Sequence, residues 1–192
     1  MSDLSFGKER RRHYFDIDIL IKILKWTFEI AIVCLIAFVL VWYFGQRVRT
    51  IGDSMKPVLE NGDVALLNRI VYNASRPDRG DVIAFYPNGN KKSYCYIKRI
   101  VGLPGETVEL KDGSVYINGK KIKEKYKTTK IEDVGLINEA VKLGSDEYFV
   151  LGDDRTGIED SRSAEVGYVK RSEIEGKVWF VAAPRRHIRF VK

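Results

Sequence analysis

The stretch WTFEIAIVCLIAFVLVWYF, residues 26–44, decides how this chain is organised. Glu29 is its single charged side chain. Trp26, Trp42 and Tyr43 stand at its two ends. A helix of about 20 apolar residues crosses roughly 30 Å of hydrocarbon, and tryptophan and tyrosine prefer the two membrane interfaces. The stretch therefore predicts a single transmembrane helix over residues 26–44.

Two other interpretations of this stretch stay open. A cleaved signal peptide normally has a shorter apolar core followed by a small-residue cleavage site, and this sequence shows neither feature. A buried core helix would not need aromatic residues at both ends. Upstream, YFDIDILIKILKW (residues 14–26) either lies in the membrane interface or continues the span as a helix.

The composition is that of a globular domain with an appendage. The chain has 192 residues, 45% of them hydrophobic and 31% charged, which excludes a disordered tail and a large multidomain enzyme. Residues 1–25 hold six Lys and Arg, and Arg47, Arg49 and Lys56 follow the span. The larger basic count before the span predicts a cytoplasmic tail over residues 1–25 and an extracytoplasmic domain over residues 45–192.

The net charge of +7 allows nucleic acid, an anionic membrane surface or acidic substrates as partners. Residues 45–192 hold 27 Lys and Arg against 21 Asp and Glu, so most of the excess lies beyond the span. A basic domain tethered next to the bilayer is attracted to anionic lipid. We therefore expect membrane lipid, and no nucleic acid, among the partners.

Short segments that alternate apolar and polar residues recur beyond the span and predict a mainly β domain. They are VALLNRIVY (64–72), DVIAFY (81–86), YCYIKRIVGL (94–103), ETVELKDGSVYING (106–119), EYFVLGD (147–153) and GKVWFVAA (176–183). The Asp-Gly and Asn-Gly pairs of KDGSVYING predict a tight hairpin. Six lysines in residues 120–130 alternate with other side chains, which favours a solvated edge strand or loop over a nucleic-acid patch.

The two cysteines predict no disulfide within the outer domain, because Cys34 lies in the span and Cys95 stands alone beyond it. The flanking sequence SYCYIK alternates like a strand and favours a small packed side chain at Cys95. A nucleophilic role is the alternative, although His187 shares no motif with this cysteine.

Candidate chemistry concentrates in three segments. GDSMKPVLENGD (52–63) presents a serine between turn residues. YIKRIVGLPGE (96–106) places Lys98 inside an apolar strand, where burial would lower its pKa and allow it to act as a base. VLGDDRTGIEDSR (150–162) combines acids and arginines, which indicates either a calcium site or a network of salt bridges.

In combination, these segments resemble one known family. A span followed by Ser-Met-x-Pro-x-Leu, Gly-Asp-Val, Lys-Arg-x-x-Gly-x-Pro-Gly, Gly-Asp-x-Arg and Asp-Ser-Arg is similar to bacterial type I signal peptidase, peptidase family S26. The resemblance implies an antiparallel β catalytic domain with a smaller β insertion over residues 105–146. It also implies a membrane-bound serine endopeptidase that removes signal peptides from exported preproteins after Ala-x-Ala-type sequences, working beside the translocation machinery in the cell membrane.

The resemblance also implies roles for individual residues. Ser54 would be the nucleophile and Lys98 its general base, in place of a histidine. Residues that would support the site are Met55, Pro57, Arg99, Asp153, Asp160 and Arg162, with a salt bridge between the last two. Residues that would bind an extended substrate are Ile51, Asp53, Cys95 and Ile97. The resemblance implies no metal and no cofactor.

Three positions depart from the family pattern. Gly52 stands where many members have a serine that contributes to the oxyanion hole, and Ile158 stands where a serine normally hydrogen-bonds the lysine. Asp154 replaces the usual asparagine and, if close to Lys98, would raise its pKa.

These departures keep open an inert homologue that acts as an assembly factor for surface structures such as pili. A nonspecific outer-surface binding protein is a residual alternative. A LexA-like self-cleaving repressor is excluded because a span, and no helix-turn-helix, precedes Ser54.

Overall fold

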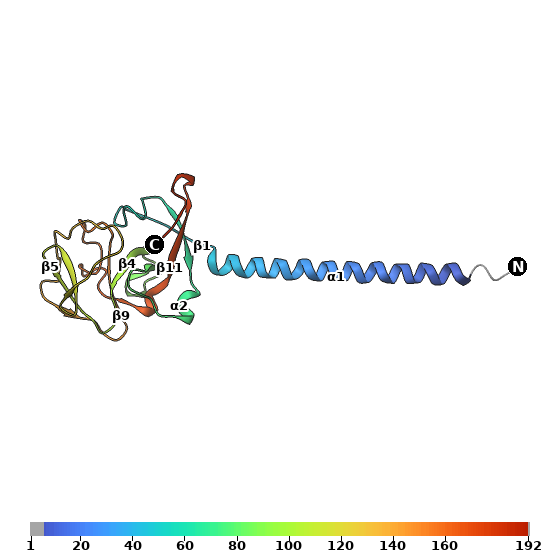
Figure 1. Ribbon diagram of the computed structural model, residues 1–192, viewed down its shortest axis with the longest axis horizontal. Coiled ribbons are helices and arrows are strands. Elements are labelled where there is room, and N and C mark those ends of the chain that lie inside the picture. Colours follow the sequence, from blue (N-terminus) through green and yellow to red (C-terminus); the bar gives the residue numbers. More distant parts are fainter. Residues whose placement is uncertain (1–5, 192) are drawn as a thin grey trace. The chain divides into compact units, whose positions relative to one another are not determined.

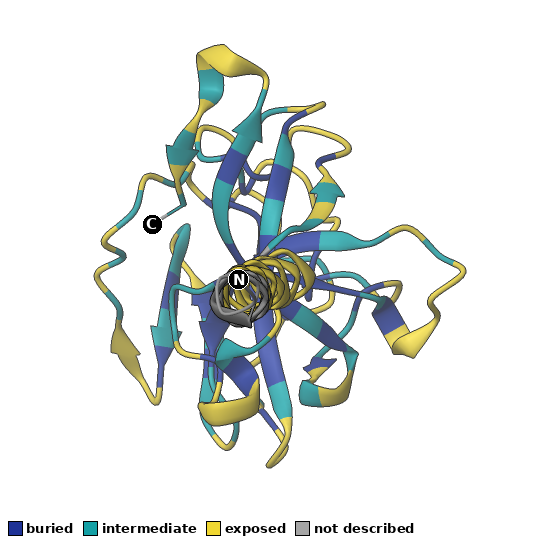
Figure 2. Cartoon of the chain, turned by 90° about the vertical axis from the view of Figure 1, so that its right-hand side faces the viewer, coloured by how far each residue is buried: buried dark blue, intermediate teal, exposed yellow. Residues whose placement is uncertain are grey.

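The computed structural model describes residues 6–191, and the side chains of residues 17–43 and 45–191. The described chain divides into two units between Trp42 and Tyr43. The first unit contains the long helix α1 (Phe6–Phe44) up to Trp42, and the last two residues of the helix belong to the second unit. The apolar part of α1, Ile17–Tyr43, is the one described helix that is long and apolar enough to cross a membrane, and it is exposed along its length (Figure 2). The upstream segment thus continues the predicted span as a single helix.

The second unit is a β domain built on a large sheet. Its strands are β1 (Gln46–Arg49), β2 (Val64–Asn68), β3 (Val82–Phe85), β4 (Tyr96–Gly102), β9 (Glu147–Leu151), β10 (Val169–Lys170), β11 (Ile174–Ala183) and β12 (Arg189–Phe190). The order is β1-β2-β11-β3-β4-β9-β10, and β12 pairs with β11. Every pairing among these strands is antiparallel. The predicted mainly β, antiparallel fold class is therefore confirmed.

A second, smaller sheet is inserted between β4 and β9. Its strands are β5 (Thr107–Lys111), β6 (Ser114–Ile117), β7 (Lys120–Lys121) and β8 (Val141–Lys142), in the order β7-β6-β5-β8. Asp112 and Gly113 turn the chain with φ of 52° and 72°, and β5 pairs with β6 as predicted. Within the β domain, β5 lies at one end, with β4 and β9 between it and β11 (Figure 1).

Short helices occupy several connections. They are α2 (Val71–Ala74), η1 (Pro87–Gly89), η2 (Arg171–Glu173) and η3 (Arg185–His187). The strand predicted over residues 64–72 is wrong at its end, because β2 stops at Asn68 and α2 follows. The Asn68 side-chain oxygen accepts hydrogen bonds from the backbone N–H groups of Ile70 and Val71, each at 3.1 Å. This local bond offers the backbone an alternative to continued strand pairing.

Strands β2, β5 and β6 bury every second residue, whereas the central strands β3, β4 and β9 are buried almost throughout. Figure 2 shows the buried positions along the strands, with exposed ones gathered in loops. One cluster packs Met55 and Leu59, 1% and 0% exposed, against Val82 and Ile97. Burying a side chain of this size contributes roughly 1.5–3 kcal/mol. This packing fixes the segment around Ser54 to the large sheet.

The lysine-rich segment behaves as a solvated edge. Residues 121–129 alternate strictly between exposed and half-buried positions, and its lysines are exposed. Ile122, Glu124 and Tyr126 face inward.

Candidate active site

Ser54 lies in the loop that joins β1 to β2, hereafter the Ser54 loop (residues 50–63). Gly52 has φ of +82°, a conformation that favours glycine, and its N–H donates to the Asn61 side chain at 3.2 Å. The Lys56 N–H closes a turn by donating to the Asp53 carbonyl oxygen at 2.9 Å. With Met55 buried directly after it, Ser54 is left half-buried at the edge of a pocket.

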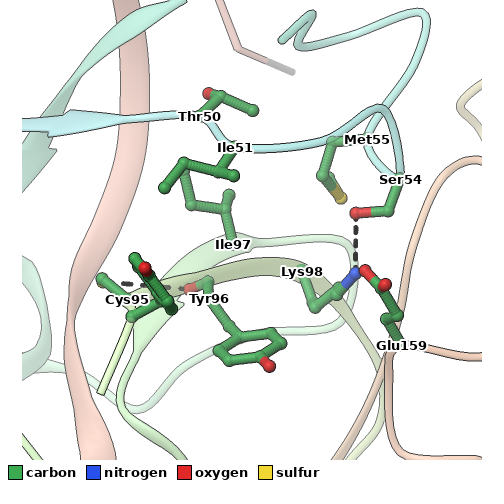
Figure 3. Close-up of a pocket in the computed structure, with 10 residues that line it drawn as sticks. Thr50, Ile51, Ser54, Met55, Cys95, Tyr96, Ile97, Lys98 and Glu159 are labelled. Atoms are coloured by element: carbon green, nitrogen blue, oxygen red, sulfur yellow. Dashed lines mark hydrogen bonds between the residues drawn. The ribbon is translucent and has the colours of Figure 1, made fainter. Parts of the chain in front are cut away.

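Lys98 reaches Ser54 from strand β4, which β11 and β3 separate from β2 in the sheet. Its Nζ donates a hydrogen bond to Ser54 Oγ at 2.7 Å across 44 residues of sequence (Figure 3). The Lys98 side chain is 3% exposed, and burial lowers its pKa against the opposing effects of Asp160 and Glu159. An amine with a lowered pKa can accept the serine proton, so the pair has the geometry of a nucleophile and its base.

The pocket beside this pair is lined mainly by the Ser54 loop and the start of β4. Its lining residues are Thr50, Ile51, Ser54, Met55, Tyr94, Cys95, Tyr96, Ile97, Lys98 and Glu159. Three of the predicted substrate-binding residues, Ile51, Cys95 and Ile97, are among them. Asp53 is not: it is exposed and forms an ion pair with Lys56 at 3.1 Å.

Cys95 is half-buried directly before β4. Burial raises the pKa of its thiol to about 11, so the thiol stays protonated at neutral pH. This chemistry agrees with a packing role and weighs against the nucleophile alternative.

The residue after Lys98 forms a fully buried ion pair. Arg99 Nε and Nη2 donate to the two carboxylate oxygens of Asp153 at 2.7 and 2.6 Å, and both side chains are 0% exposed. The Arg99 guanidinium carbon lies 4.0 Å from the centroid of the Tyr126 ring. These contacts tie β4 to the loop after β9 and to the lysine-rich segment.

A second ion pair supports the site from the same loop. Arg162 Nε and Nη2 donate to the two Asp160 carboxylate oxygens, each at 2.8 Å, as the resemblance implies. Asp160 Oδ2 also accepts the Gly152 N–H at 3.2 Å. Arginines therefore neutralise both Asp153 and Asp160, which favours the salt-bridge interpretation of this segment over calcium.

Two of the three departures from the family pattern, Asp154 and Ile158, lie in the same loop, whereas Gly52 lies in the Ser54 loop. The Asp154 carboxylate accepts hydrogen bonds from the side chains of Thr129 at 3.1 Å and Thr156 at 2.8 Å, and bonds to Thr156 lower its pKa. Charges that act on Lys98 come instead from Asp160, Glu159 and Arg162. Ile158 is 39% exposed and Pro57 is exposed, and neither lines the pocket.

Gly152 is a contact to Ser54 that sequence reasoning missed. A β-carbon at Gly152 would lie 2.5 Å from the Ser54 carbonyl oxygen and 2.8 Å from the Asp154 carbonyl oxygen. The Asp154 N–H donates to that same Ser54 oxygen at 3.0 Å. The absence of a side chain at Gly152 therefore allows the loop after β9 to approach Ser54 closely. In the sequence, the Gly-Asp pair of residues 152 and 153 was the one signal of this contact.

The C-terminal segment (residues 184–191) also holds the Ser54 loop, and this was not foreseen. Arg189 Nη2 donates to the Val58 carbonyl oxygen at 2.8 Å. His187 Nδ1 lies 2.9 Å from Asp63 Oδ1. Thus side chains more than 120 residues away in sequence fix the far end of the Ser54 loop.

Comparison with known proteins identifies the family of this chain. Residues 23–183 match the family model described as signal peptidase, peptidase S26. The chain is 31% identical to Signal peptidase I P of Bacillus subtilis subsp. natto, covering 97% of this chain and 100% of that protein. It is 34% identical to Signal peptidase I S of Bacillus subtilis strain 168, covering 87% and 92%.

A solved structure is also similar in sequence. The crystal structure of a signal peptidase I from Enterococcus faecalis V583 shares 34% identity with a TM-score of 0.43, covering 54% of this chain and 97% of that one. The family match spans most of the chain, including the larger part of the apolar helix, the Ser54 loop and β4. The chain therefore belongs to the signal peptidase family of serine peptidases, peptidase S26.

Proposed function

We propose that this protein is a membrane-bound endopeptidase that removes N-terminal signal peptides from exported preproteins, with Ser54 as nucleophile and Lys98 as general base. The observation that carries the proposal is the 2.7 Å hydrogen bond between the Lys98 amine and the Ser54 hydroxyl at the edge of a pocket. The names of its relatives support the substrate class.

The chemistry follows from the two groups. Neutral Lys98 accepts the Ser54 proton while Oγ attacks the scissile carbonyl carbon, and backbone N–H groups including that of Ser54 stabilise the oxyanion. Collapse of this intermediate breaks the C–N bond, and the Lys98 ammonium gives its proton to the leaving amine. Lys98 then takes a proton from the water that attacks the acyl carbon, and it returns this proton to Ser54 Oγ as the ester C–O bond breaks and the carboxylic acid product leaves.

The pocket supports a choice of small residues before the scissile bond. An extended signal peptide would pair with the segments that lead to the two reacting groups, residues 49–53 and 95–97. Main-chain pairing supplies affinity, and alternate side chains enter pockets that supply specificity. Ile51 and Ile97 line the pocket and favour small apolar side chains such as those of an Ala-x-Ala sequence.

The helix α1 fits a membrane anchor, and the excess of basic residues before it favours a cytoplasmic amino terminus with the β domain outside. In this arrangement the domain lies beside the translocation machinery, which delivers preproteins through the same membrane. Anionic lipid would attract the basic β domain.

The test is cleavage of a preprotein by the detergent-solubilised full chain. Wild-type protein should release the signal peptide, whereas Ser54→Ala and Lys98→Ala should each lose at least about 10³-fold in rate, since a residual rate survives loss of one catalytic group. Ser145→Ala and Lys142→Ala are matched controls, because both residues are exposed and lie outside the pocket lining. Equal processing by all variants, or none by the wild type, would contradict the proposal.

A further inference from the structure

Glu159 belongs to the pocket but not to the chemistry described above. It lines the pocket together with Ser54 and Lys98, from the loop between β9 and β10. Figure 3 shows Ile51 and Cys95 on one side of the Ser54–Lys98 hydrogen bond and Glu159 on the other. Among the described lining residues it is the only one with a carboxylate.

The charge of Glu159 is not neutralised in the way its neighbours' charges are. Asp160 is paired with Arg162, and Asp53 is paired with Lys56. Glu159 is exposed, and none of the ion pairs formed by the described residues includes it. Glu159 does act on Lys98 at a distance, since its charge raises the pKa of that amine against the lowering by burial.

The direction in which the substrate crosses the site places the residues after the scissile bond next to the Glu159 carboxylate. If residues before the scissile bond lie along 49–53 and 95–97, residues after the bond must leave on the far side of Ser54 and Lys98, where Glu159 lies. This step rests on the proposed function. We infer that Glu159 is a specificity-determining residue that favours a basic side chain, and disfavours an acidic one, at the first two positions after the scissile bond.

The experiment compares peptides that differ in one charge. Each peptide carries the same Ala-x-Ala sequence with Lys, Gln or Glu at the first or second position after the bond, and kcat/KM is measured for the full-length wild type, Glu159→Gln and Glu159→Lys. At low salt, the wild type should prefer Lys over Gln by about twofold to fivefold and Gln over Glu by a similar factor, as expected for an exposed charge pair. Glu159→Gln should level the ranking, and Glu159→Lys should reverse it.

The ratio of kcat/KM between two peptides, measured with the same variant, separates an effect on specificity from an effect on Lys98 as the base. Loss of the Glu159 charge also alters Lys98, but that effect multiplies the rate for every peptide equally. The wild-type ratios should shrink toward one in about 1 M salt, where the Debye length is only about 3 Å. Glu139→Gln is a matched control and should keep the wild-type ratios, because Glu139 is exposed and lies outside the pocket lining.

Three outcomes would overturn the inference, and they separate it from the proposed function. Cleavage that depends on Ser54 but shows no ranking by charge, or the same ranking in Glu159→Lys as in the wild type, rejects the role of Glu159 and leaves the peptidase assignment standing. Absence of any cleavage that depends on Ser54 rejects both.

Discussion

Replacing Gly152 by alanine tests whether the loop after β9 sets the position of Ser54. The added β-carbon would lie 2.5 Å from the Ser54 carbonyl oxygen, about 0.9 Å closer than an ordinary contact of 3.4 Å. The neighbour on the other side is the Asp154 carbonyl oxygen at 2.8 Å, so the methyl group has backbone on two sides. Ser54 must therefore shift by several tenths of an ångström up to about 0.9 Å. A misplacement near 1 Å costs on the order of 10²-fold in rate.

The assay is turnover of a fluorogenic signal-peptide substrate in detergent, at a temperature where circular dichroism shows the variant folded. We expect kcat of Gly152→Ala to fall by about 10- to 100-fold with KM little changed, and overpacking to cost about 1–3 kcal/mol of stability. Gly157→Ala is the matched control, because a β-carbon there meets nothing within 4 Å. If Gly152→Ala kept its kcat within twofold of the wild type, the claim that this glycine positions Ser54 would be refuted.

Three further predictions follow from buried groups. Asp153→Asn removes the carboxylate that pairs with Arg99, and we expect the free energy of unfolding to fall by about 3–5 kcal/mol in a denaturant titration; wild-type stability would contradict this. Because burial lowers the pKa of Lys98, the unfolded chain binds more protons between that lowered value and the ordinary one, so wild-type stability should rise with pH there. Lys98→Met should lose this pH dependence and activity and melt about 2–4 °C higher at pH 7; a lower melting temperature would argue against the desolvation cost. In a Cys34→Ser background, alkylation of Cys95 should be slow at pH 7 and accelerate about tenfold per pH unit toward its pKa of about 11; a plateau below pH 9 would contradict the burial of the thiol.

Features set by neighbouring residues could be predicted from the sequence. The apolar run of the span and the Asp112-Gly113 turn are local, and the structure contains the helix and the hairpin. The predicted strand over residues 64–72 was too long because the signal at Asn68 was overlooked. The side chain of this asparagine accepts hydrogen bonds from backbone N–H groups just after it, which ends β2. The proximity of Ser54 and Lys98 came from family resemblance, because no local pattern joins residues 44 positions apart.

Features made by distant segments could not be predicted. A glycine is needed at position 152 because the backbone of Ser54 and Asp154 approaches it closely. A Gly-Asp pair also occurs in many turns, so the sequence alone does not indicate this contact. Glu159 enters the pocket because Arg162 holds the adjacent Asp160, which decides where the loop runs. The contacts of His187 and Arg189 to the Ser54 loop depend on how the last strand returns to β11. A single sequence carries no record of such pairings.

The contact between the Ser54 carbonyl oxygen and the Asp154 N–H joins two segments that are synthesised about 100 residues apart. Lys98 reaches the same serine from a third segment, and the C-terminal segment secures the loop last. The Ser54–Lys98 pair is therefore assembled by tertiary contacts between segments far apart in the sequence, and its geometry depends on the packing of the whole β domain.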